Sequence, residues 1–160
     1  MATQTYVALA TTTLSSSASS VIFSSIPQDY RDLVIVVDVA TGGSLVLARF
    51  KFNNDAVTEV EWVTMSGDGS STTSGAFGGA TEFQTFAATT SRILHTLQLM
   101  DYSATDKQKT GLHRGNAATG QVRASAMRWI STSAISQIEV ASFANQFQSG
   151  STFYLYGIEA

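Results

Sequence analysis

The chain has 160 residues, a size typical of one domain with its own core, and it contains no cysteine, which excludes disulfides and thiolate metal sites. Charged residues make up 13% of the sequence and the formal net charge is −3, so nothing in the composition attracts nucleic acid or an anionic membrane. The N-terminus lacks the pattern of a secretory signal, and no segment approaches the roughly 20 apolar residues of a membrane span. We therefore expect a soluble domain that binds neither nucleic acid nor membrane.

The first predicted strand lies in the N-terminal segment 1–14, which we expect to form an arm or an edge strand. Its side chains alternate with a period of two, which is typical of β-structure. An edge strand leaves backbone groups free to pair with another chain. Tyr6, Val7 and Leu9 are therefore candidate contact residues for a partner protein.

The only proline, Pro27, stands before the most apolar run of the chain, residues 33–39. Proline fixes its own φ and favours an extended residue before it, so a turn here leads into a strand. Because the run is apolar at odd and even positions, we expect it to be covered on both faces. In the following strands, alternation with polar side chains predicts that Phe50, Phe52 and Trp62 face the core.

Residues 66–80 are rich in glycine and hydroxyl side chains and are predicted to form a long surface loop. Long loops often carry function, although a surface loop without function stays an alternative. Asp68 lies between two glycines, as in part of a calcium loop, but calcium needs six or more oxygen ligands, so we interpret it as a turn residue. The candidate contact residues in this segment are Asp68, Ser70, Ser71 and Phe77.

Beyond this segment, alternating patterns predict six more strands separated by turn residues, over 81–89, 92–101, 109–115, 121–131, 135–144 and 151–158. Residues 93–100 are also compatible with a helix by propensity, and this alternative stays open. About ten short strands at this spacing predict an all-β fold. We expect one antiparallel β-sandwich domain, jelly-roll-like, over residues 1–160.

The titratable residues form no convincing catalytic or metal-binding pattern. His95 and His113 lack neighbours that would orient a base or complete a metal site, so both are predicted to be structural, with His113 in a loop-like segment. Glu59 and Glu61 share a strand face, but a glycosidase pair needs a cleft and separated pKa values. The sequence therefore predicts no enzymatic activity, no cofactor and no metal ion.

The segment from residue 107 to residue 128 is modestly basic. A solvated face is one interpretation of these cations. If the fold brings them together, they could instead bind an acidic protein partner or a surface glycan. The candidates for such a contact are Lys107, Lys109 and Arg114.

Four short segments stand out, namely SSIPQDYRDLVI (24–35), FNND (52–55), GDGSS (67–71) and LYGI (155–158). In this order they are similar to a pattern in small virion proteins and fibre-terminal domains of tailed bacteriophages. Asn54 stands where glycine is frequent in that family, which affects the turn rather than the fold. The resemblance spans most of the chain.

This resemblance implies a β-sandwich module without enzymatic activity, assembled in the host cytoplasm and carried on the virion. Its implied partners are the major capsid protein or other virion proteins, and a homo-oligomer, by analogy a trimer, is expected. Because these residues contain no shaft or coiled-coil segment, a capsid cement or decoration protein is favoured. The alternative is a tail, neck or fibre module that binds a glycan or protein receptor on the host.

Overall fold

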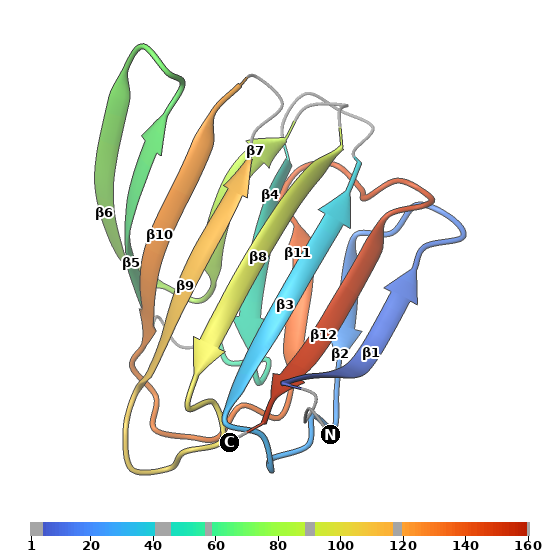
Figure 1. Cartoon of the computed structure of the whole chain (residues 1–160), viewed down its shortest axis with the longest axis vertical. Helices are drawn as coiled ribbons and strands as arrows, with labels where there is room; N and C mark the ends of the chain where they lie inside the picture. The colour runs from blue at the N-terminus through green and yellow to red at the C-terminus, as the bar shows by residue number, and fades with distance from the viewer. Residues whose placement is uncertain (1–4, 41–45, 57–58, 89–91, 117–119, 160) are drawn as a thin grey trace.

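Two antiparallel β-sheets packed face to face make up the fold (Figure 1). The computed structural model describes residues 5–40, 46–56, 59–88, 92–116 and 120–159, and these contain twelve strands and no helix, hence none that could cross a membrane. The prediction of an all-β antiparallel sandwich in a single domain is confirmed, and the helical alternative for residues 93–100 is wrong. The strands are β1 (Tyr6–Thr13), β2 (Ser20–Phe23), β3 (Asp32–Val39), β4 (Val46–Phe52), β5 (Val60–Gly67), β6 (Thr72–Ala80), β7 (Phe83–Ala88), β8 (Ile93–Met100), β9 (Lys109–Asn116), β10 (Val122–Trp129), β11 (Ile138–Ser142) and β12 (Thr152–Ile158).

The two sheets differ in size. The larger sheet has eight strands in the order β1-β12-β3-β8-β9-β10-β5-β6, and the smaller has four in the order β2-β11-β4-β7. In Figure 1 the larger sheet faces the reader and the smaller sheet lies behind it, while β5 and β6 extend past the smaller sheet at the left. The two edges of the larger sheet are therefore β1 and β6.

The core lies between the sheets and is built by alternation along the strands. On β3, Leu33 and Val37 are fully buried, and such burial stabilises the fold by about 1.5–3 kcal/mol for each large aliphatic side chain. On β4, Phe50 and Phe52 are 0% and 1% exposed, which confirms their predicted place in the core. Trp62 on β5 is also buried, as predicted.

The opposite face of β3 differs from the expectation of a strand covered on both sides. Val36 and Asp38 are half buried there, and no second layer of described residues lies over them. Neighbouring side chains within the sheet supply the partial cover, since Val36 stands opposite Tyr154 of β12. On this side of β3, Val34 is therefore buried within the sheet surface and Val36 is half buried, and the described strands form no second sheet above them.

The turn that contains Pro27 leads into β3 and packs against β12, the last strand. A Cβ atom added to Gly157 would lie 2.4 Å from Cγ of Tyr30, so the glycine lets the tyrosine ring approach the strand. The Tyr102 hydroxyl donates a hydrogen bond to the carbonyl of Pro27, and the Gln28 amide donates to the carbonyl of Ile135 at 3.0 Å. The approach of Tyr30 to Gly157 joins segment 24–35 to segment 155–158.

The prediction of a long loop over residues 66–80 is wrong, because β5 and β6 form a hairpin with a short turn between them. Asp68 holds the turn by accepting hydrogen bonds from the backbone N–H groups of Ser70 at 2.9 Å and Ser71 at 2.7 Å. Glycine and hydroxyl side chains are compatible with a strand here because β6 is an exposed edge. Within segment 1–14, the edge-strand prediction is confirmed by β1, and residues 1–4 lie outside the described part.

Candidate docking surface

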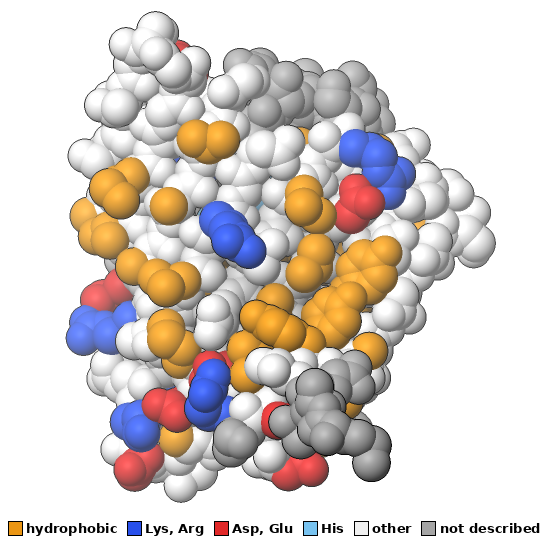
Figure 2. Space-filling model, in the orientation of Figure 1, with side chains coloured by type: hydrophobic (Ala, Val, Ile, Leu, Met, Phe, Trp, Pro, Cys, Tyr) orange, Lys and Arg blue, Asp and Glu red, His pale blue; other side chains and the backbone are white. Residues whose placement is uncertain are grey.

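The face of the larger sheet turned away from the smaller sheet, called the outer face below, carries most of the exposed large hydrophobic side chains. Among the described residues nine such side chains are exposed, and six of them, with exposed fractions of 51% to 66%, lie on this face. Figure 2 shows hydrophobic side chains spread across it from β12 to β5. A concentration of this kind marks an interaction site more often than scattered single residues do. The six are Tyr6, Val63, Met65, Leu94, Leu112 and Val122.

Strand register places two of these residues, Leu112 and Val63, in a mainly apolar row across the sheet, called the apolar stripe below. Leu112 of β9 stands opposite Ala126 of β10, and Ala126 stands opposite Val63 of β5. On the other side, Val34 of β3 pairs with Tyr156 of β12. The row from Tyr156 to Val63 therefore crosses six neighbouring strands and is interrupted by one polar residue, Gln98 of β8.

Ion pairs lie toward the margins of the outer face rather than along the stripe. Arg92 and Asp38 are 3.0 Å apart, and Arg128 and Glu61 are 2.5 Å apart. Arg31 contacts Asp32 at 3.2 Å. An apolar centre with a charged rim is the usual anatomy of a protein–protein interface.

Arg114 is the exception, because it projects from β9 near the middle of the face. It stands opposite Thr96 of β8 and Ala124 of β10. The described part of the chain supplies it with neither a carboxylate nor a hydrogen-bond acceptor. Figure 2 likewise shows a basic side chain near the middle of this face with no acidic side chain beside it.

Two predicted contact residues, Tyr6 and Arg114, are brought together by the fold. They line the same hollow of about 350 Å³ on the outer face, although their strands are far apart in the sequence. Val7 and Leu9 are half buried, and Leu9 packs against the core, so only Tyr6 of the N-terminal group presents its side chain on this face.

The other predicted contact residues lie elsewhere. Asp68, Ser70 and Ser71 are exposed in the turn between β5 and β6. Phe77 is 50% exposed and stacks on Trp62 with ring centroids 5.1 Å apart, so it faces away from the outer face. Lys107 is exposed and forms an ion pair with Asp101 at 3.3 Å.

Lys109 was predicted as an exposed contact residue, and this prediction is wrong. It is fully buried, and its ammonium group donates hydrogen bonds to the carbonyls of Lys107 at 3.0 Å and Thr132 at 2.7 Å. The ammonium also lies 6.0 Å from the centroid of the Trp129 ring. Burial lowers the pKa of Lys109.

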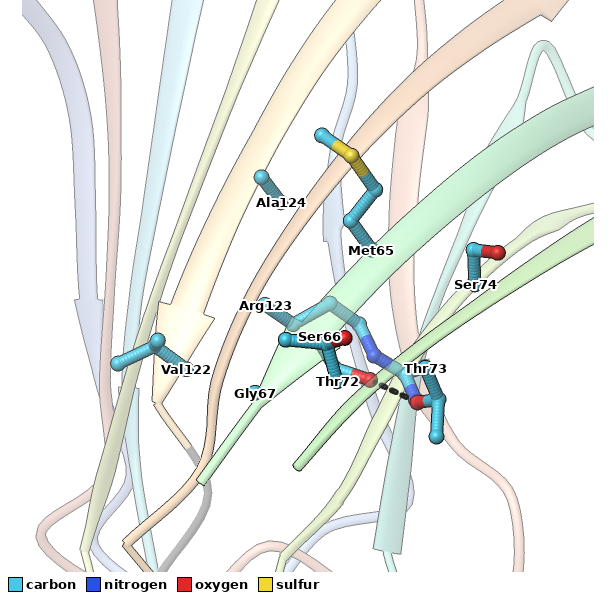
Figure 3. A pocket seen from close by; sticks show the side chains of 9 residues that line it. All are labelled: Met65, Ser66, Gly67, Thr72, Thr73, Ser74, Val122, Arg123 and Ala124. Carbon is cyan, nitrogen blue, oxygen red and sulfur yellow. Dashed lines mark hydrogen bonds between the residues drawn. The ribbon is translucent and has the colours of Figure 1, made fainter. Parts of the chain in front are cut away.

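A further hollow of about 560 Å³ lies where β10, β5 and β6 run side by side near the hairpin turn (Figure 3). In Figure 3 Met65 stands beside Ala124, and the hydroxyls of Ser66 and Thr73 share a hydrogen bond of 2.7 Å. The lining is mainly apolar and continues the outer face toward its β6 edge. It is formed by Met65, Ser66, Gly67, Thr72, Thr73, Ser74, Val122, Arg123 and Ala124.

His95 and His113 form a buried pair on neighbouring strands, so His113 lies in β9 and the prediction of a loop there is wrong. Their Nδ1 and Nε2 atoms are 3.0 Å apart. Burial, with a smaller effect from the Arg123 cation, lowers the pKa of His95 to about 4, and burial together with His95 lowers that of His113 to about 3. Among the described residues no three potential ligands gather into a metal site.

Sequence reasoning missed most of the outer-face residues. Leu112, Val63 and Leu94 were not singled out as contact residues, because each lies in a predicted strand in which it alternates with other residues of the sheet. The available signal was the run 33–39, which is apolar on both faces although only one face meets the core.

A scan against models of protein families finds no match to this chain, and a search of curated protein sequences finds none either.

Proposed function

We propose that this protein is a non-enzymatic structural component of a tailed bacteriophage particle, which cements or decorates the head shell by docking its outer face on shell proteins. The observation that carries the proposal is the concentration of exposed hydrophobic side chains on the outer face, with ion pairs at its margins. The similarity of four segments to small virion proteins supplies the biological setting.

The outer face is large enough for this role. Eight strands about 4.8 Å apart, each about eight residues long at about 3.3 Å per residue, cover on the order of 900 Å². A stable, specific interface buries about 800 Å² on each partner. One flat sheet face can therefore hold the protein on a shell, and two shell subunits that share this face would be held to each other.

The edges of the larger sheet offer a second means of assembly. Neither β1 nor β6 contains a charged residue or a proline, the features that normally prevent pairing between exposed edges. We therefore keep the prediction of a homo-oligomer, a trimer by analogy, and place its contacts at these edges. This arrangement leaves the outer face of each copy available to the shell.

Two matched substitutions test the docking surface. Leu112 on the outer face and Ile22 on the smaller sheet are 55% and 54% exposed, so replacing either by aspartate perturbs the fold to a similar small extent. Heads that lack this protein are incubated with each variant, and bound protein is measured by co-sedimentation.

We expect Leu112→Asp to bind at least about tenfold more weakly than wild type, because a carboxylate would be buried in an apolar contact, and Ile22→Asp to bind normally. Equal binding of both variants would contradict the proposal. Binding to tails or fibres instead of heads would favour the receptor-binding alternative.

A further inference from the structure

We infer that Arg114 receives a carboxylate of the partner protein at the centre of the outer face, and that this partner is not a second copy of the chain. The inference rests on the proposed function, because it names the chemistry of the same docking surface. The guanidinium of Arg114 is exposed on β9 and has no acceptor among the described residues. Arg92 and Arg128 on the same face are, in contrast, paired with carboxylates.

Docking an apolar partner over Arg114 removes water from the guanidinium. An unpaired cation covered in this way loses its hydration without compensation, which opposes binding. A carboxylate of the partner compensates for this lost hydration, because its two oxygens match two parallel N–H donors of the guanidinium. The partner surface therefore has to carry an aspartate or glutamate opposite Arg114.

The surface around Arg114 has room for such a side chain. Hollows of about 350 Å³ and about 420 Å³ lie on its two sides, and both include Thr96 and Arg114. The first has apolar walls that could contact the methylene groups of an acidic side chain, with Gln98 as a further donor. Its outer-face lining consists of Tyr6, Val34, Thr96, Gln98, Leu112 and Arg114.

A second copy has no unpaired carboxylate on its own outer face among the described residues. The acidic residues that the strands place there are Asp32, Asp38 and Glu61, and each is already paired with an arginine. Glu59 precedes β5, and its Oε2 atom is buried. Two outer faces brought together would therefore offer each Arg114 only carboxylates that would have to be shared with, or taken from, an arginine of their own chain.

The test compares wild type with Arg114→Met, Arg114→Glu and Arg114→Lys in binding to heads that lack this protein. We expect binding about tenfold weaker for Arg114→Met and about a hundredfold weaker for Arg114→Glu, with Arg114→Lys closest to wild type. Added salt should weaken the binding of wild type more than that of Arg114→Met.

Arg114→Lys also permits a direct identification of the acceptor. A water-soluble carbodiimide joins a lysine amine to a carboxylate that contacts it, and mass spectrometry locates the linked peptides. We expect a link from position 114 to an aspartate or glutamate of a head protein. The wild-type protein is the control, because Lys107 can react in both but position 114 only in the variant.

Head binding unaffected by Arg114→Met would overturn the inference and leave the proposed function intact. A link from position 114 to another copy of the chain, or self-association abolished by Leu112→Asp in sedimentation, would overturn the inference and would also contradict docking of the outer face on shell proteins. Binding of N-acetylneuraminic acid to the purified protein that is lost in Arg114→Met would identify an acidic sugar as the ligand and overturn the protein partner. Failure of wild type to bind any part of the particle would instead reject the proposed function and, with it, the head protein as the source of the carboxylate.

Discussion

Lys109 is a charged residue that the fold uses as part of its interior. Its ammonium group satisfies the carbonyls of Lys107 and Thr132, both at hydrogen-bond distance. The carbon chain of the lysine adds apolar contact, which is common for this side chain. This arrangement explains how a fully buried lysine is compatible with a stable domain.

Replacing Lys109 by methionine keeps most of the apolar volume but leaves the two carbonyls without a donor. We expect the free energy of unfolding to fall by about 1–3 kcal/mol, measured by urea denaturation. Lys107→Met is the control, because the exposed ion pair with Asp101 contributes little, and a change below about 0.5 kcal/mol is expected. Equal effects of the two substitutions would show that the buried hydrogen bonds are not important.

The buried histidine pair predicts a pH dependence of stability. Both pKa values lie below the value of about 6.5 for an unfolded histidine, so between pH 6.5 and pH 4 the unfolded chain binds more protons than the folded one. Burial of the neutral pair therefore costs no stability through proton binding above pH 7, and the free energy of unfolding decreases as the pH falls below about 6.5. We expect a loss on the order of 2 kcal/mol per histidine between pH 7 and pH 5 in urea unfolding.

An NMR titration of the two histidine rings provides an independent measurement of the same property. The buried pair should show no titration above pH 5. A midpoint near pH 6.5 for either ring would mean that the ring is hydrated and would contradict the buried pair.

The room for this pair comes from Gly115, where an added Cβ atom would lie 2.1 Å from Nδ1 of His95.

At the scale of the elements, the close approach between the proline-containing turn and β12 depends on Gly157. We expect Gly157→Ala to lower the free energy of unfolding by about 1–3 kcal/mol, because the added methyl group overlaps the base of the Tyr30 ring. Gly67→Ala is the matched strand control, since the nearest atom to an added Cβ there, the carbonyl oxygen of Ser71, would be 3.4 Å away. A double-mutant cycle with Tyr30→Ala should show that the two effects are not additive, and additive effects would contradict direct contact.

The sequence was sufficient to predict elements whose side chains alternate clearly between two environments. Phe50 and Phe52 fall on the buried face of β4 because they alternate along the strand with the charged residues Arg49 and Lys51. The hairpin that contains β6 could not be predicted in this way, since glycine and hydroxyl residues carry no such alternation. Its formation depends on pairing with β5 and on the turn at Asp68, where hydrogen bonds from Ser71 and Ser70 hold the pKa of the carboxyl below its ordinary value.

The candidate surface was predicted in part. Arg114 and Tyr6 were predicted as contact residues from their sequence context, and that role stays a prediction, whereas their proximity depends on the strand order of the larger sheet. Lys109 was predicted to be exposed because a charged side chain usually is. Its burial depends on two carbonyls that accept from the ammonium, and one of them, that of Thr132, is brought near only by the fold. The apolar stripe escaped prediction because buried and exposed apolar positions look alike in a single sequence.

At the scale of the whole molecule, the two sheets present different surfaces. The exposed side of the smaller sheet includes the ion pair between Arg49 and Glu82 at 2.7 Å, and Lys51, whose ammonium donates a hydrogen bond to Asn54 at 3.2 Å. The outer face of the larger sheet has its ion pairs toward the margins and an apolar stripe across its width. This asymmetry supports the proposal that the larger sheet docks on a partner, although Ile22 on the smaller sheet and Phe143 beyond β11 are also exposed.

The most direct test of the proposed function is a cryo-electron microscopy map of the tailed phage particle in which we propose that the protein resides. The account predicts density repeated across the head shell, with the eight-stranded sheet against the shell and the four-stranded sheet toward solvent. Density with the four-stranded sheet against its neighbours, or density confined to the tail or fibres, would contradict it.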